Sequence, residues 1–167
     1  MFFDGLSEKD LAKIEKIGSL HKYKQGEAVL KEGEGGTSFS IVLKGKVQVR
    51  KYVADGTYKA LVELSEFDLI GELGFFGATN RTASVVALED TEMLEFSRPG
   101  FEKFTESKPE IGWKVYRNMA QILADRLTCN DETLMNTIIW ALGQPRDAHP
   151  RPGADIRESP KLKVLRK

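Results

Sequence analysis

The sequence of 167 residues contains one cysteine, Cys129, so it can form no intramolecular disulfide and lacks the ligands of a cysteine-rich zinc site. Its two histidines, His21 and His149, have no metal-ligand spacing and predict no metal centre. No hydrophobic run approaches the length of a membrane span, and the first residues lack the basic start and apolar stretch of a secretion signal. We therefore expect a cytoplasmic protein without a bound metal, a disulfide or a membrane span.

An excess of charge of either sign is also missing. The chain has 25 basic and 25 acidic residues, which gives no electrostatic case for nucleic-acid binding. Residues 143–167, however, hold seven basic and three acidic residues together with four of the six prolines. We expect a folded domain over residues 1–142 and a flexible basic tail over residues 143–167. The tail either docks on an acidic partner or a membrane surface, or only solubilises the chain.

Short β-prone runs separated by glycines fill the first half of the chain. They have no helical pattern between them, which favours an antiparallel sandwich, jelly roll or barrel over a parallel sheet. The Asp55-Gly56 pair is the strongest hairpin signal among them. The predicted strands are residues 27–31, 38–43, 46–53, 58–64, 84–88 and 92–96.

Helical patterns flank this β region on both sides. Ser7 is a predicted N-cap for a short amphipathic helix that ends near Gly18, and Phe101 and Phe104 belong to another short helix. A much longer helix is predicted from Pro109 to about Leu142. Its apolar series is either a dimer seam or the face that packs on the β domain, and comprises Ala120, Leu123, Leu127, Leu134 and Ile138.

The segment with the clearest chemistry reads GELGFFGATNRTA and spans residues 71–83. Its glycines allow close backbone approach to a ligand, the start of a short helix offers N–H groups to an anion, and Arg81 can bind a phosphate with two donors. Glu72 can accept a hydrogen bond from a sugar hydroxyl. The same spacing equally allows Glu72 and Arg81 to form an ion pair that closes a loop.

This segment and its surroundings resemble the cyclic nucleotide-binding domain family, which includes bacterial catabolite activators and regulatory subunits of protein kinase A. The resemblance covers residues 2–135 and also rests on the turns at 26–27 and 32–34, on residues 38–45 and on residues 124–127. It implies an α+β fold: an antiparallel β-roll of about eight strands, a short N-terminal helix, a short helix inside a phosphate-binding cassette and a long C-terminal helix.

The resemblance also implies a role for each cassette residue. Arg81 would neutralise the cyclic phosphate, Glu72 would bind the ribose 2′-hydroxyl, and Thr82 would favour cGMP without excluding cAMP. On the long helix, the residues implied to contact the base are Arg126, Asn130, Asp131 and Leu134. The full implied binding set in the cassette is Gly71, Glu72, Leu73, Gly74, Arg81, Thr82 and Ala83.

Two positions depart from the family pattern. Phe67 replaces a glycine that suits a turn before the cassette, and Ile70 replaces an aromatic residue. The predicted function is a regulatory module that binds cAMP or cGMP, needs no cofactor, lacks a DNA-binding domain and signals through its long helix to a partner protein or within a homodimer. The alternative is a scaffold that keeps the fold, binds no nucleotide and uses Glu72 and Arg81 as an ion pair. Neither reading predicts an enzyme.

Overall fold

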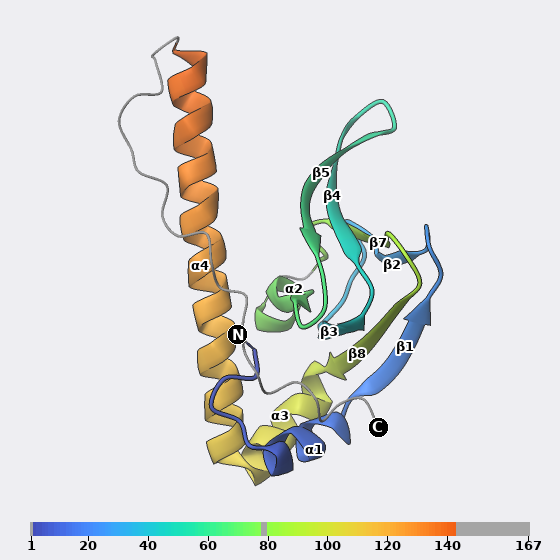
Figure 1. Cartoon of the computed structure of the whole chain (residues 1–167), viewed down its shortest axis with the longest axis vertical. Coiled ribbons are helices and arrows are strands. Elements are labelled where there is room, and N and C mark those ends of the chain that lie inside the picture. Colours follow the sequence, from blue (N-terminus) through green and yellow to red (C-terminus); the bar gives the residue numbers. More distant parts are fainter. Residues whose placement is uncertain (1, 78–79, 143–167) are drawn as a thin grey trace. The chain divides into compact units, whose positions relative to one another are not determined.

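The computed structural model describes residues 2–77 and 80–142 (Figure 1). The chain divides into two compact units, Met1–Ala120 and Gln121–Lys167. The predicted tail lies outside the described residues, so its flexibility and its partners stay predictions.

Eight strands form two antiparallel sheets of four strands each, which confirms the predicted fold class. The first sheet has the order β1-β8-β3-β6 and the second has the order β2-β7-β4-β5. The strands are β1 (Ser19–Tyr23), β2 (Ala28–Leu30), β3 (Ser38–Lys44), β4 (Val47–Ala54), β5 (Thr57–Leu64), β6 (Leu69–Ile70), β7 (Ser84–Ala87) and β8 (Thr91–Ser97).

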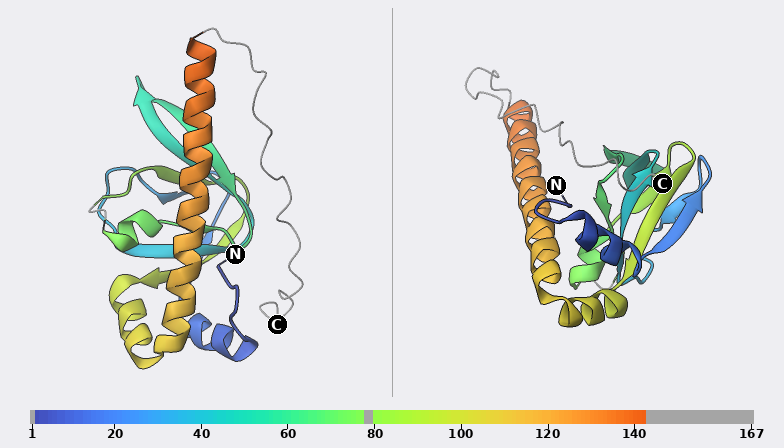
Figure 2. Two further views of the ribbon diagram at one scale, coloured as in Figure 1. Left: turned by 90° about the vertical axis from the view of Figure 1, so that its left-hand side faces the viewer. Right: turned by 60° about the horizontal axis from the view of Figure 1, so that its bottom comes forward.

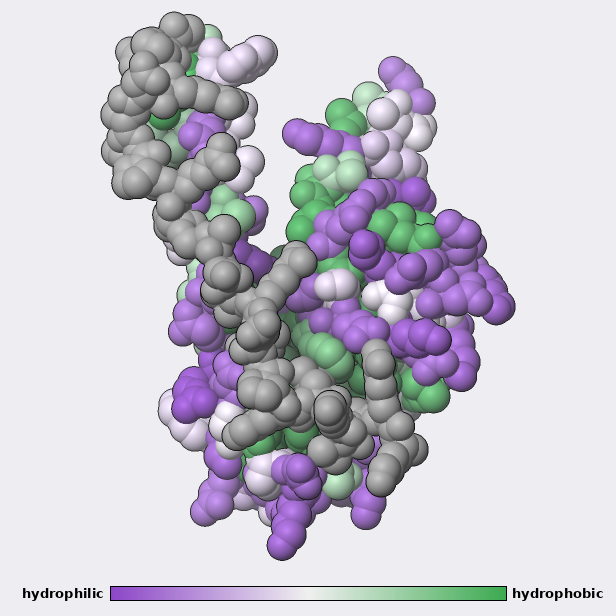
Figure 3. Space-filling model, in the orientation of Figure 1, coloured by the Kyte–Doolittle hydropathy of each residue, from purple (hydrophilic) through white to green (hydrophobic). Residues whose placement is uncertain are grey.

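Six of these strands are the predicted ones, with ends that differ by at most one residue. The β4–β5 hairpin turns at Asp55 and Gly56, which both have positive φ values of 50° and 76°. Such a turn matches the twist of the paired strands. The hairpin exposes apolar side chains, among them Val53 and Leu61. Green patches lie over this part of the surface in Figure 3.

One hydrophobic core cluster lies where side chains of both sheets meet. Val42 and Met93 come from the first sheet and Val47 and Val85 from the second, and all four are at most 3% exposed. Their burial removes apolar surface from water and stabilises the roll by roughly 1.5–3 kcal/mol for each fully buried side chain.

Two helices lie at one end of the roll (Figure 2). Helix α1 (Glu8–Glu15) leads into the start of β1, and α3 (Arg98–Ser107) follows the end of β8. Because β1 and β8 are antiparallel neighbours, these two strand ends coincide. Ser7 caps α1 as predicted, and its side chain and that of Asp10 form a reciprocal capping box.

The cassette helix α2 (Glu72–Phe76) joins this end through an aromatic cluster. The ring of Phe39 in β3 lies 4.8 Å from Phe75 in α2, 4.9 Å from Phe96 in β8 and 5.3 Å from Phe101 in α3. The cluster fixes α2 on the first sheet, because rings at these separations pack as a rigid apolar group.

Helix α4 (Pro109–Ala141) begins at the predicted proline and is the long helix expected from the sequence. In the first unit its buried side chains Ile111, Val115 and Met119 recur every four residues and face the core. Among the described residues no helix is long and apolar enough to cross a membrane.

Candidate functional site

Arg81 is the centre of the site and is 8% exposed. Its Nη1 donates hydrogen bonds to the carbonyl oxygens of Ser38 at 2.7 Å and Gly71 at 3.0 Å, and its Nη2 donates to the Ser38 hydroxyl at 2.8 Å. One guanidinium therefore joins the start of β3 to the residue that caps α2. These hydrogen bonds all end on neutral oxygen atoms.

Three glycines surround this guanidinium and leave it room. A Cβ atom at Gly36 would lie 2.5 Å from Nε of Arg81, and one at Gly71 would lie 2.7 Å from Nη1. A Cβ at Gly74 would lie 2.5 Å from the Gly36 carbonyl oxygen and 2.9 Å from Nη1 of Arg81. We call Gly36, Gly71 and Gly74 the glycine cradle, since any side chain at these positions would displace the guanidinium or the backbone.

Two carboxylates act on the charge of Arg81. Burial lowers the pKa of the Arg81 guanidinium, and the negative charges of Glu95 and Glu72 act in the opposite direction. An arginine side chain stays protonated in proteins, so the site holds a permanent buried cation. Glu72, in the first turn of α2, is itself 7% exposed. The site therefore contains a buried carboxylate and a buried guanidinium.

Helix α2 places backbone donors beside the cradle. Gly71 is its N-cap, with a left-handed φ of 77° that glycine adopts without strain, and no side chain caps the helix there. The N–H groups of a first helical turn have no acceptor within the helix. The Phe75 N–H closes the turn by donating to the Gly71 carbonyl at 3.2 Å.

The structure brings together part of the predicted binding set. Gly71, Glu72 and Gly74 lie around Arg81, whereas the side chain of Leu73 is 47% exposed. Thr82 is exposed, and its carbonyl oxygen accepts a hydrogen bond from Nζ of Lys51 at 3.0 Å. Ala83 is half-buried and leads into β7. The ligand contacts of these residues stay predictions.

The four predicted base-contacting residues lie on α4 in the second unit. Arg126 is partly buried, and Asn130, Asp131 and Leu134 are exposed. Because they belong to the other unit, their contact with a base stays a prediction.

Sequence reasoning missed three residues that build the site. Gly36 and Ser38 precede the cassette by more than thirty residues, and only the pairing of the sheet brings them to Arg81. Arg98, the first residue of α3, donates from Nη2 to the Gly74 carbonyl at 2.6 Å and lies 5.9 Å from the Phe75 ring. No motif in the sequence signals these contacts, although the Gly35-Gly36 pair indicates a close backbone approach.

The turn before the cassette keeps its bend although it lacks the usual glycine. Phe67 has a φ of 72°, and the Asp68 N–H donates to the Ser65 carbonyl at 3.0 Å. The left-handed region costs a residue with a side chain roughly 1–2 kcal/mol. Phe67 therefore holds the turn at a local cost in free energy. Ile70, the other departure, is 2% exposed and packs in the core.

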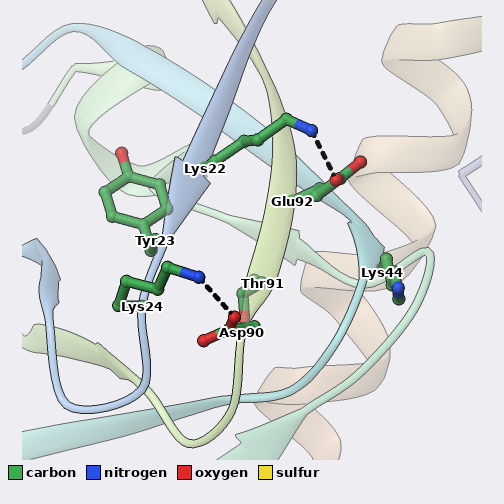
Figure 4. Close-up of a pocket in the computed structure, with 7 residues that line it drawn as sticks. All are labelled: Lys22, Tyr23, Lys24, Lys44, Asp90, Thr91 and Glu92. Carbon is green, nitrogen blue, oxygen red and sulfur yellow. Dashed lines mark hydrogen bonds and ion pairs between the residues drawn. The ribbon is translucent and has the colours of Figure 1, made fainter.

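A hollow lies apart from the cassette. It has a volume of about 270 Å³ and is lined by residues of β1, β8 and the end of β3 (Figure 4). Lys22 pairs with Glu92 at 2.8 Å and Lys24 pairs with Asp90 at 2.7 Å across it. Four of its five charged side chains thus form ion pairs with each other, and Lys44 is the fifth. Among the described residues no cluster of histidine, cysteine or carboxylate side chains could hold a metal ion.

Comparisons with known proteins agree with this geometry. Residues 20–108 match the family described as the cyclic nucleotide-binding domain. A CRP-like cAMP-activated global transcriptional regulator of Mycobacterium tuberculosis is 26% identical over 136 residues, which cover 81% of this chain and 59% of the regulator. A cAMP-dependent protein kinase regulatory subunit of Mycosarcoma maydis is 37% identical over 90 residues, covering 54% of this chain and 17% of that subunit.

A solved structure shows the same arrangement. The Thermus thermophilus catabolite activator protein superposes with a TM-score of 0.74 at 28% identity, covering 83% of this chain and 63% of that one. The chain thus spans less than two thirds of the length of these relatives. The matched region contains the whole cassette with Glu72, Arg81 and the glycines around them. The chain belongs to the cyclic nucleotide-binding domain family.

Proposed function

We propose that this domain is a regulatory sensor that binds a 3′,5′-cyclic nucleotide, cAMP or cGMP, at the glycine cradle. The observation that carries the proposal is the buried Arg81 guanidinium, which is held by neutral oxygen atoms beside the first turn of α2. A buried cation is costly to maintain, and Glu95 and Glu72 offset only part of that cost, because burial is the larger influence and lowers the Arg81 pKa. A cyclic phosphate would add an anion in direct contact with the guanidinium, and charge-assisted hydrogen bonds to it are strong.

The sugar and the base would be held by different residues. Glu72 is buried next to Arg81 and would accept a hydrogen bond from the ribose 2′-hydroxyl. Thr82 is exposed directly after Arg81 and would face the base. The names of the bacterial regulator and of the kinase regulatory subunit both refer to cAMP, which favours cAMP as the first nucleotide to test.

Nucleotide binding would be signalled to a partner by helix α4 and would not drive a catalysed reaction. This helix is continuous from the first unit to Ala141, and its second part exposes Leu127, Leu134 and Ile138 at spacings of seven and four residues. Such a stripe suits pairing with a second copy of the helix. We propose a homodimer through this seam, a downstream partner protein, and no enzymatic activity of the domain itself.

Thermal unfolding with added nucleotide tests the proposal. A ligand that binds only the folded protein stabilises it by about 2.7 kcal/mol at a concentration of 100 times its Kd. We expect the Tm of the wild type to rise with cAMP or cGMP, and this rise to vanish in Arg81→Ala. The control is Lys103→Ala, which removes an exposed positive charge on α3 and should keep the full rise.

One observation favours the alternative scaffold role. Arg81 already joins β3 to α2 through its bonds to Ser38 and Gly71, so it has a structural use without a ligand. A scaffold predicts that Arg81→Ala lowers the Tm while neither nucleotide changes the Tm of the wild type. The same experiment therefore separates the two functions.

A further inference from the structure

The turn of residues 65–68 leads into the cassette and has an unfavourable residue at its bend. Phe67 occupies the position that needs positive φ in a type II turn, where glycine is preferred. Its N–H group donates to the Val42 carbonyl at 2.7 Å, which fastens the turn to β3. The chain then passes through β6 to Gly71 and Glu72, so the shape of this turn sets their positions.

The side chain of Phe67 is held by a residue from the start of the described chain. The rings of Phe3 and Phe67 meet edge to face, with centroids 6.1 Å apart and planes at 70°. Aromatic pairs in this geometry attract each other beyond the area that they bury. Phe3 therefore offsets part of the conformational cost at Phe67.

Residues 2–5, which we call the N-terminal strap, are tied to α4. Asn118 of α4 is 5% exposed, and its Nδ2 donates to the carbonyl oxygens of Phe2 and Asp4, both at 2.8 Å. Phe2 is 1% exposed, and its ring lies 5.9 Å from Phe39 in the aromatic cluster. The strap is thus anchored to α4 through Asn118, and it contacts the turn of residues 65–68 through Phe3.

Building on the proposed function, we propose that the N-terminal strap positions the nucleotide site and links it to helix α4. Two residues do the positioning. Phe3 holds the turn of residues 65–68 through its contact with Phe67, and Asn118 fixes the strap to α4. A shift of the turn on nucleotide binding then changes the hydrogen bonds of Asn118. A shift of α4 in turn moves Gly71 and Glu72.

The first test needs no nucleotide and follows amide hydrogen exchange by NMR in the full chain. Phe3→Ala should speed exchange of the Phe67 amide about tenfold, since the turn loses its ring contact, while Phe3→Tyr should leave it unchanged. Asn118→Ala should also speed hydrogen exchange of the Phe67 amide. Its matched control is Lys114→Ala, which lies on the same helix and removes only the ion pair with Asp10 at 3.6 Å.

Two results would overturn the link. One is an unchanged exchange rate of the Phe67 amide in Phe3→Ala. The other is an equal increase in the exchange rates of the β8 amides, which would mean that the variant loosens the whole roll and not the turn alone. If Asn118→Ala fails to fold, the Phe3 variants still decide whether the strap holds the turn.

The second test measures cAMP affinity by titration calorimetry. Phe3→Ala should weaken binding several-fold in the wild type and have no further effect in a Phe67→Gly background, where the ring is gone and the turn has its preferred residue. Equal effects in both backgrounds would contradict a role through Phe67. A wild type that binds no nucleotide would refute the proposed function, whereas the exchange experiment would still test the strap.

Discussion

Single residues in the glycine cradle have two roles: they hold the Arg81 guanidinium, and they shape the space beside it. Gly74 illustrates this most clearly: its missing side chain admits both the Gly36 carbonyl and the Arg81 guanidinium, and its own carbonyl accepts from Arg98. A change of one methyl group at this position therefore affects three segments of the chain.

Gly74→Ala is expected to weaken nucleotide binding by about tenfold or more, since the added Cβ must displace backbone as well as Arg81. Titration calorimetry on the folded variant measures the effect. Gly26→Ala is the matched control: Gly26 has a φ of 86° with no atom near its Cβ position, so the change strains the backbone but leaves the cradle intact. Equal losses of affinity in both variants would argue against a specific role for Gly74.

The cradle also marks how far the sequence alone predicts the site. Glu72, Arg81 and the two glycines near Glu72 are recognisable because they lie in one short segment. Ser38, Gly36 and Arg98 are not, because the contacts of these residues depend on strand register and on the packing of α3. The left-handed Phe67 could be suspected from the sequence, but its contact with Phe3 depends on the tertiary fold.

At the scale of elements, strand β1 shows why two strands went unpredicted. Its partly buried residues are His21 and Tyr23 and its apolar Leu20 is 54% exposed, so no alternation of apolar and polar residues indicates a strand. Strand β6 has two residues and is too short for any pattern. Both exist because β8 and β3 offer them hydrogen-bonding edges.

Helix α1 shows the opposite case, where a local signal suffices and carries a pH dependence. Hydrogen bonds from the Ser7 backbone and side chain lower the pKa of Asp10 below its ordinary value of 3.8, and Lys114 and Lys13 add to the effect. A carboxylate with a lowered pKa in the folded state stabilises the protein above its unfolded pKa. This stabilisation is lost as the pH falls through the folded pKa.

Asp10→Asn should therefore lower the Tm at pH 7 by roughly 2–4 °C, the equivalent of about 1 kcal/mol for loss of a cap. The difference from the wild type should shrink as the pH falls below 4, and thermal scans across this range measure it. Glu8→Gln changes an acid of the same turn outside the capping box and serves as control. A difference that stays constant with pH would show that the charge of Asp10 is not involved.

At the scale of the whole molecule, the proposed signal depends on what helix α4 contacts beyond Ala120. Leu127 and Leu134 are 62% and 58% exposed in the single chain, which leaves an apolar stripe to be covered. The proposed dimer covers it, with Asn130 as a polar residue that sets the register. The domain boundary at residue 142, the role of the basic tail and a cytoplasmic location stay predictions.

Leu134→Glu should convert the dimer to a monomer, because two carboxylates would face each other across the seam. Sedimentation equilibrium measures the mass directly. Met135→Glu places the same charge on the neighbouring, 55% exposed position and should leave the dimer intact. A wild type that sediments as a monomer would refute the seam, and the stripe would then need another partner.

The central claim is that the glycine cradle binds a cyclic nucleotide through Arg81. Isothermal titration of the wild type with cAMP and with cGMP, beside Arg81→Ala, tests it most directly. The account predicts saturable binding of at least one nucleotide, with one site per chain, and its loss in the variant. No heat with either nucleotide, or an unchanged affinity in Arg81→Ala, would contradict the account.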